Sequence, residues 1–182
     1  MAEKLYVAHL GRGIIAEYYK DLISDLCSEF SLPGLNKRQR LPHITFKSPF
    51  SQRDPKEVQR VMRDLAKSTR PFPILIDGFD FFKRNNLLYI AADTTTRGRD
   101  KIERIMATCQ RELGAKKKGY DQRDRILHLT VVKRKEVGSA FPHICEYVEK
   151  IAPPKFRIMC DNIALLGRGR GLSGIREAYE LG

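Results

Sequence analysis

Apolar and polar residues along the chain follow two kinds of periodic pattern. Short runs rich in β-branched and aromatic residues predict strands. These runs are Leu5–Leu10, Leu41–Phe46, Phe72–Phe82, Leu87–Asp93, Ile126–Val132, Phe156–Leu166 and Ile175–Leu181. Longer segments with apolar residues at every third or fourth position predict helices. These segments are Ile14–Phe30, Pro55–Ser68, Arg99–Leu113 and about Val137–Ile151. The order βαβαββ followed by αβαββ indicates an α+β fold, with helices packed outside antiparallel or mixed sheets.

The second half of the chain repeats the plan of the first. The segment His43-Ile-Thr-Phe corresponds to His128-Leu-Thr-Val at an offset of 85 (128 − 43). The strand that begins at Phe72 corresponds to the one that begins at Phe156, at an offset of 84 (156 − 72). Two halves with one plan predict a single domain over residues 1–182, with two pseudo-symmetric lobes around a central cleft. Clefts between lobes are where ligand sites usually lie.

Each of the two matching strands carries an H-x-T motif. Because successive strand side chains point to opposite faces, His43 and Thr45 share one face, as do His128 and Thr130. The positions that alternate with them are apolar, so each motif buries two side chains and presents an imidazole beside a hydroxyl. A single H-x-T would be a weak signal, whereas two in a duplicated unit favour a functional site over a pair of core histidines.

The four polar side chains suit displacement at phosphorus. Such a reaction needs a base for the nucleophile and an acid for the departing oxygen, on opposite sides of the phosphate. Imidazole titrates near ~6.5, so one ring can act as each, and threonine hydroxyls can donate to the non-bridging oxygens. The pattern predicts a phosphoesterase that needs no metal and no cofactor. A metal site is disfavoured because no carboxylate or third histidine accompanies either motif at ligand spacing.

At these residues the chain resembles the 2H phosphoesterase superfamily, and within it the bacterial and archaeal group of 2′-5′ RNA ligases or cyclic phosphodiesterases. The resemblance rests on the segments Pro42–Lys47 and His128–Val131 and on the repeated strand order, and it covers nearly the whole chain. Two departures concern the second motif. Leu127 stands where a proline often precedes the histidine, and Lys133-Arg134 stands where a single arginine often follows.

The resemblance implies a bilobed α+β fold and hydrolysis of a 2′,3′-cyclic phosphate in RNA or nucleotides, commonly to a 2′-phosphate. Some members of the family also join RNA ends through a 2′-5′ linkage. The resemblance further implies that His43 is the acid toward the departing 3′ oxygen and His128 the base toward water. Thr45 and Thr130 are then the phosphate-binding residues.

Other polar residues invite a functional interpretation with less support. Strand alternation puts Lys47 on the face of the first motif, where it is a candidate substrate contact; a solvated lysine at a strand end is the alternative. His9 and His143 lack the threonine, and His143, which falls inside a predicted helix, is expected to be structural. Asp77 and Asp161 occupy matching repeat positions, but each precedes a turn-prone residue, which favours a strand bend over a carboxylate pair.

The charge of the chain favours a polyanionic partner. There are 34 basic and 22 acidic residues, for a formal net charge of +12, and such a surplus attracts nucleic acid. A solvated basic face is the alternative, as it is for the basic loop Gly114–Arg125. The segment Gly167-Arg-Gly-Arg-Gly is expected to connect two strands, since it matches no phosphate-binding loop pattern. A noncatalytic RNA-binding module that recognises terminal phosphates is therefore the second functional hypothesis.

The remaining sequence signals concern the compartment. The four cysteines have neither C-x-x-C nor zinc-finger spacing and are expected to be reduced thiols. No apolar stretch approaches the roughly 20 residues of a membrane span, and the N-terminus lacks the pattern of a signal peptide. The sequence thus predicts a cytoplasmic protein without a membrane partner.

Overall fold

The computed structural model describes residues 4–36, 41–51, 54–113, 126–167 and 174–182. The strands are β1 (Lys4–Leu10), β2 (His43–Ser51), β3 (Phe72–Phe82), β4 (Leu87–Thr94), β5 (Leu127–Lys133), β6 (Lys155–Cys160), β7 (Asn162–Leu166) and β8 (Ile175–Glu180). The helices are α1 (Ile14–Glu29), α2 (Pro33–Asn36), α3 (Pro55–Ser68), α4 (Thr96–Glu112), α5 (Arg134–Val137) and α6 (Phe141–Lys150), with 3-10 turns at Lys83–Asn85 and Gly138–Ala140. The predicted α+β class is confirmed.

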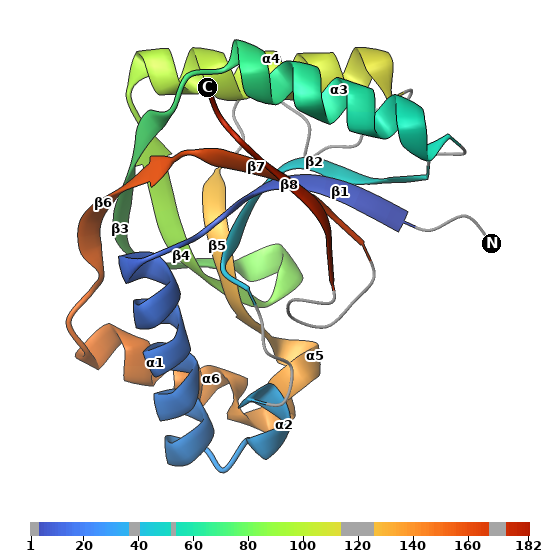
Figure 1. Cartoon of the computed structure of the whole chain (residues 1–182). Coiled ribbons are helices and arrows are strands. Elements are labelled where there is room, and N and C mark those ends of the chain that lie inside the picture. The colour runs from blue at the N-terminus through green and yellow to red at the C-terminus, as the bar shows by residue number, and fades with distance from the viewer. Residues whose placement is uncertain (1–3, 37–40, 52–53, 114–125, 168–173) are drawn as a thin grey trace.

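The strands of the described residues form one curled sheet in the order β6-β3-β4-β5-β2-β1-β7-β8. Every neighbouring pair is antiparallel. Helices α3 and α4 lie side by side at one end of the molecule, while α1, α2, α5 and α6 gather at the other (Figure 1). Apolar side chains from both helix groups join those of the sheet in one hydrophobic core.

The predicted pseudo-twofold symmetry is visible in the strand pairing. Ile44 pairs with Leu129, and these residues are related by the repeat offset of 85 (129 − 44). Ile74 pairs with Ile158, which lies at the offset of 84 (158 − 74). In an antiparallel pair a local twofold axis passes between partners that are equivalent. In both strand pairs, equivalent residues of the two repeats pair with each other, as the predicted symmetry requires.

The two halves of the sheet do not coincide with the two halves of the chain. On one side of the β2–β5 junction lie β6, β3 and β4 with β5, and on the other lie β1, β7 and β8 with β2. Each half of the sheet therefore combines strands from both repeats. Strands of both repeats occur in each half because the chain crosses from one half of the sheet to the other between β6 and β7.

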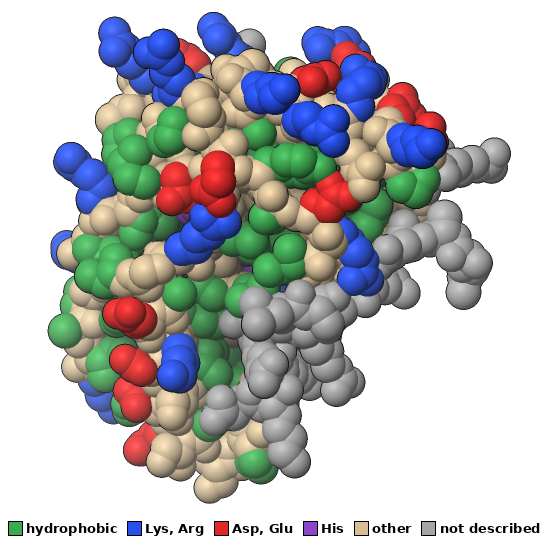
Figure 2. Space-filling view, in the orientation of Figure 1, with side chains coloured by type: hydrophobic (Ala, Val, Ile, Leu, Met, Phe, Trp, Pro, Cys, Tyr) green, Lys and Arg blue, Asp and Glu red, His purple; other side chains and the backbone are tan. Residues whose placement is uncertain are grey.

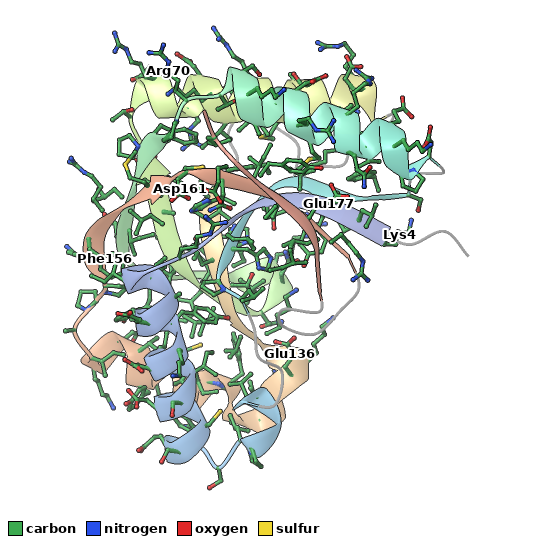
Figure 3. All side chains as sticks on the ribbon, viewed as in Figure 1. Lys4, Arg70, Glu136, Phe156, Asp161 and Glu177 are labelled. Carbon is green, nitrogen blue, oxygen red and sulfur yellow. The ribbon has the colours of Figure 1, made fainter. Side chains whose placement is uncertain are left out.

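The prediction of one strand over Phe156–Leu166 is wrong, because the chain bends at Asp161 (Figure 3). β6 pairs with β3 at one end of the strand order, whereas β7 pairs with β1 and β8 near the other. The β3–β6 pairing ends at Cys160, and the carbonyl of Asp161 accepts instead from the amide of Leu181 at 2.7 Å. The strand-bend role predicted for Asp161 is confirmed.

Local signals explain where the two helices of the α3–α4 layer begin. The Asp54 side chain accepts from the amide of Lys56 at 2.9 Å and caps α3, with Pro55 in the first turn. Thr95 caps α4 through a 3.2 Å bond from the amide of Gly98. α4 therefore begins at Thr96, three residues before the predicted start.

The predicted helix over Val137–Ile151 is interrupted at its beginning. Gly138 has φ 59°, a left-handed conformation that ends α5. A short 3-10 turn follows, and α6 starts at Phe141 with Pro142 in its first turn, where proline needs no amide hydrogen. The predicted helix is confirmed from Phe141 to Lys150, and its first four residues belong to other elements.

Candidate active site

The two H-x-T motifs lie on neighbouring strands in the middle of the sheet. Ile44 and Leu129, the central residues of the motifs, are cross-strand partners and are fully buried in the core. The histidine and the threonine of each motif are only half-buried. The alternation predicted from the sequence is therefore confirmed in both strands, and the four polar side chains share the face opposite the core.

The antiparallel register brings these four residues into one small group. On either side of the Ile44–Leu129 pair, His43 comes beside Thr130 and Thr45 comes beside His128. The two histidines are thus diagonal neighbours, and diagonal neighbours in a sheet lie roughly 7–8 Å apart. This spacing suits a phosphate group between the imidazoles, with a threonine hydroxyl on each side.

Both imidazoles make the same backbone contact. Nδ1 of His43 lies 2.9 Å from the carbonyl oxygen of Leu41, and Nδ1 of His128 lies 3.0 Å from that of Ile126. A carbonyl oxygen only accepts, so Nδ1 carries the hydrogen in each ring. Nε2 is then an acceptor in the neutral ring and a donor in the protonated ring. Each histidine is therefore oriented to exchange a proton through Nε2.

Contacts from distant parts of the chain hold the motif strand β5 and the strand β1 that pairs with the other motif strand. The Tyr19 hydroxyl of α1 donates to the carbonyl of Thr130 at 2.8 Å. The Asn162 side chain accepts from the amide of Leu10 at 2.9 Å and donates to its carbonyl at 3.0 Å. Leu10 is the cross-strand partner of His43, so these bonds fix the backbone beside both histidines.

Aromatic rings border both histidines, and no local pattern in the sequence indicates them. Tyr6 lies 5.6 Å from His43 between ring centroids, and burial raises the pKa of its hydroxyl. Phe82 and Tyr89 lie 5.0 and 5.4 Å from His128. Tyr89 comes from β4, where it pairs with Thr130. Only the register between strands distant in sequence reveals these neighbours.

The structure places Lys47 on the face opposite to the one predicted. A register shift between Val7 and Ala8 marks a β-bulge, after which Lys47 pairs with the core residue Val7. Lys47 is 1% exposed, and its ammonium group donates to Gln110 of α4 at 2.8 Å. One extra residue in a strand reverses the alternation of faces. Lys47 therefore stabilises the contact between β2 and α4 and lies away from the motif face.

The other two histidines lie apart from the motifs. His9 is buried on the core side of β1, with Nδ1 3.3 Å from the carbonyl oxygen of Asn162. Burial is the main cause that lowers its pKa. His143 is exposed on α6, 4.0 Å from the carboxylate of Glu146. Neither histidine belongs to the H-x-T group, and the structural role expected of His143 stays a prediction.

The carboxylates at matching repeat positions are not brought together. Asp77 is exposed, 3.7 Å from the ammonium group of Lys155, and pairs with the first residue of β6. Asp161 follows the last residue of that strand. Gly78 has φ 81° beside a register shift in β3, so the predicted strand bend after Asp77 is confirmed.

The described residues show no group of three His, Cys, Asp or Glu side chains that could hold a metal ion. In the same part of the chain, no helix has the length and hydrophobicity to cross a membrane. All four cysteines are described, and none forms a disulfide. The whole basic loop Gly114–Arg125 lies outside the described residues, as does the segment from Gly167 to Gly171 except Gly167 itself. On the face shown in Figure 2, Lys and Arg side chains gather over α3 and α4 with acidic side chains between them.

A curled antiparallel sheet with one H-x-T motif on each of two central, symmetry-related strands is the arrangement of a 2H phosphoesterase. The model of the 2'-5' RNA ligase superfamily matches residues 22–172, and the chain belongs to this family. Comparison with curated protein sequences gives no significant match.

Several solved structures share the fold. E. coli LigT complexed with 3'-AMP has a TM-score of 0.63 at 16% identity, over 100% of this chain and 99% of that one. TT0787 of Thermus thermophilus has a TM-score of 0.57 at 14% identity, over 98% and 97%. Usb1 of Kluyveromyces marxianus has a TM-score of 0.51 at 10% identity, over 98% and 97%. At these identities the likeness concerns the fold of the whole chain.

Proposed function

We propose that the protein is a metal-independent phosphodiesterase that opens 2′,3′-cyclic phosphate ends of RNA or nucleotides to a 2′-phosphate. The observation that carries this proposal is the matched pair of motifs. Two imidazoles with the same Nδ1 contact and two hydroxyls share one face of the sheet, related by the pseudo-twofold axis. An in-line displacement needs donors and acceptors on both sides of phosphorus, and this arrangement supplies them.

The proposed reaction assigns one proton transfer to each histidine. Neutral His128 accepts a proton from water through Nε2 as the water oxygen bonds to phosphorus. The bond between phosphorus and the 3′ oxygen breaks, and protonated His43 delivers its Nε2 proton to that oxygen. The hydroxyls of Thr45 and Thr130 donate to the non-bridging oxygens, where negative charge accumulates. Exchange with solvent then restores both protonation states.

The nucleotide class of substrate has support from the structural neighbours. Structures of E. coli LigT, whose fold this chain shares, are complexes with 3'-AMP, ATP and NADP+. The positive net charge of +12 also favours an anionic substrate. End joining through a 2′-5′ linkage would be the same displacement at the same four side chains, with the 5′ hydroxyl of a second RNA taking the place of water and the 3′ oxygen again departing.

Incubation with 2′,3′-cyclic AMP, followed by phosphorus NMR, tests the proposal directly. We expect one product, the 2′-phosphate, at a rate that excess EDTA leaves unchanged. His43→Ala and His128→Ala should each abolish most of the turnover. His143→Ala is the matched control, because this exposed histidine on α6 lies in no H-x-T motif, and it should turn over like the wild type.

Three results would contradict the proposed function or part of it. Loss of activity in EDTA that a divalent ion restores would place the mechanism in a different class. A 3′-phosphate product would mean that the bond between phosphorus and the 2′ oxygen breaks, and not the bond to the 3′ oxygen. Binding of cyclic phosphate ends without any turnover would favour the noncatalytic RNA-binding module.

A further inference from the structure

Tyr89 lies on β4, directly beside the second motif. It is the cross-strand partner of Thr130, and the next residue but one on β4, Ala91, is the partner of His128. Its side chain is 1% exposed, and its ring meets that of His128 at 62° with centroids 5.4 Å apart. Tyr89 therefore packs against the reacting histidine from the neighbouring strand.

The Tyr89 ring is itself held at two points. Its hydroxyl donates to Oδ2 of Asp80 at 2.7 Å, across the β3–β4 pair. Phe82 stacks on the Tyr89 ring at 4.3 Å and 27°, and also meets His128 edge-on at 5.0 Å and 85°. Aromatic pairs in such geometries contribute about 0.5–1.5 kcal/mol beyond the burial of their area. The rings of Tyr89, Phe82 and His128 thus form a cluster. The Tyr89 hydroxyl bonds this cluster to the carboxylate of Asp80.

Packing alone does not require the hydroxyl of Tyr89. Burial, followed by the hydrogen bond to Asp80, raises the pKa of the phenol, so it stays a donor throughout the range where histidine titrates. A phenylalanine would fill the same space but would leave the ring without its anchor. The Tyr89–Asp80 bond is therefore an additional constraint on a ring that touches His128.

Comparison of the two symmetry-related motifs shows that the anchored tyrosine occurs beside only one of them, which we call a half-site together with its neighbouring side chains. Ala8 is the partner of Thr45 in the first motif, as Tyr89 is the partner of Thr130 in the second. The repeated fold therefore tolerates a methyl group at the position of Tyr89. A large anchored side chain at this position is a feature of the half-site that contains His128.

We propose that Tyr89, anchored by Asp80, is a positioning residue that holds the His128 imidazole with Nε2 aimed at the attacking water. This inference rests on the proposed function. The carbonyl of Ile126 fixes Nδ1, and the Tyr89 and Phe82 rings restrict rotation of the imidazole about the same contact. Loss of the anchor should lower kcat with little change in KM, because substrate binding does not require the base to be aligned.

Kinetics of four variants with 2′,3′-cyclic AMP test the anchor. Tyr89→Phe and Asp80→Ala should each lower kcat by roughly 10-fold, a part of the ~100-fold that a 1 Å misplacement costs. The double variant should be no slower than either single one, because both remove the same bond. Asp80→Asn keeps an oxygen that accepts from the phenol, so it should retain near wild-type kcat.

The matched control is Tyr179→Phe. Tyr179 also donates to a carboxylate, that of Glu177, but it lies on β8 at the edge of the sheet and packs against the core. Removing this hydroxyl should leave kcat unchanged. A kcat loss equal to that of Tyr89→Phe would mean that any tyrosine–carboxylate bond matters equally, and would overturn the positioning role.

Nitrogen-15 NMR of the His128 ring keeps the inference separate from the proposed function, since it needs no turnover. The wild type should show the tautomer with hydrogen on Nδ1, and Tyr89→Leu should show a mixture of tautomers with broadened signals. If the wild type turns nothing over, the proposed function fails while this result still decides the positioning role. Unchanged His128 signals in folded Tyr89→Leu would refute the inference. Should Tyr89→Leu not fold, unchanged kcat in both Tyr89→Phe and Asp80→Ala would refute it.

Discussion

Replacing the two motif histidines, separately and together, is the sharpest test of the site. Asparagine is the informative substitution at His43 and His128, because its amide nitrogen can take over the Nδ1 bond to the backbone carbonyl. The local structure should then survive while proton transfer at Nε2 is lost. Alanine variants, which lose both functions, separate the two effects.

General magnitudes for proton-transfer catalysis give the expected size of each effect. One positioned proton-transfer group contributes about 10²–10⁴ in rate, or about 2.7–5.4 kcal/mol at ~1.36 kcal/mol per tenfold. Independent groups would give about 10⁴–10⁸ for the double variant. In the proposed reaction His43 and His128, on the adjacent strands β2 and β5, act on one phosphate in one displacement. The double variant should therefore be within about tenfold of the slower single one.

The assay is the rate of 2′,3′-cyclic AMP hydrolysis measured across pH. The wild-type profile of kcat/KM should be bell-shaped, with limbs that belong to the pair of histidines, and each single variant should lose one limb. Folding is checked by circular dichroism and thermal unfolding. Multiplicative losses in the double variant, or near wild-type turnover in folded His43→Asn or His128→Asn, would refute the paired mechanism.

Further predictions concern stability and binding. Burial lowers the folded-state pKa of His9, so the unfolded chain binds the proton more readily and stability should fall as pH drops below about 6.5. The urea midpoint of His9→Gln should depend less on pH between 5 and 7 than that of the wild type; equal slopes would contradict the assignment. A methyl group at Gly98 would collide with Thr94 Oγ1, so Gly98→Ala should lower the free energy of unfolding by about 1–3 kcal/mol despite the better helix propensity of alanine. Gly34→Ala is its control, since no atom lies within 4 Å of a Cβ there, and an equal loss would count against the collision. RNA affinity should fall steeply with salt, and charge reversal at residues 116–118 should flatten that slope; an affinity independent of salt would favour a small-molecule substrate.

Most helices and strands were predicted from local periodicity, and so was the strand face on which each motif lies. Pro55–Ser68 and Phe72–Phe82 have the same bounds in the sequence prediction and in the structure. The H-x-T alternation was likewise correct, because side-chain direction in a regular strand depends only on odd or even position. The internal repeat added long-range information, since it predicted that the two motif strands occupy equivalent places.

The errors arose where a single residue changed the phase or the course of a strand. The bulge in β2 turns Lys47 toward α4, although simple alternation puts it beside the motif. The bend at Asp161 sends β7 to the opposite half of the sheet from β6. A one-residue shift costs little in local propensity yet reverses every later side chain, so a periodic pattern does not reveal it.

The family of the chain, its α+β class and the four polar residues of the motifs follow from the amino-acid sequence alone, because these depend on residue type and short spacing. The pairing of the strands and their register are known only from the folded chain. Folding brought His43 beside Thr130, and Tyr89 and Phe82 against His128. Such contacts join residues tens of positions apart, and they form because the packed sheet offers the best burial for all its strands at once.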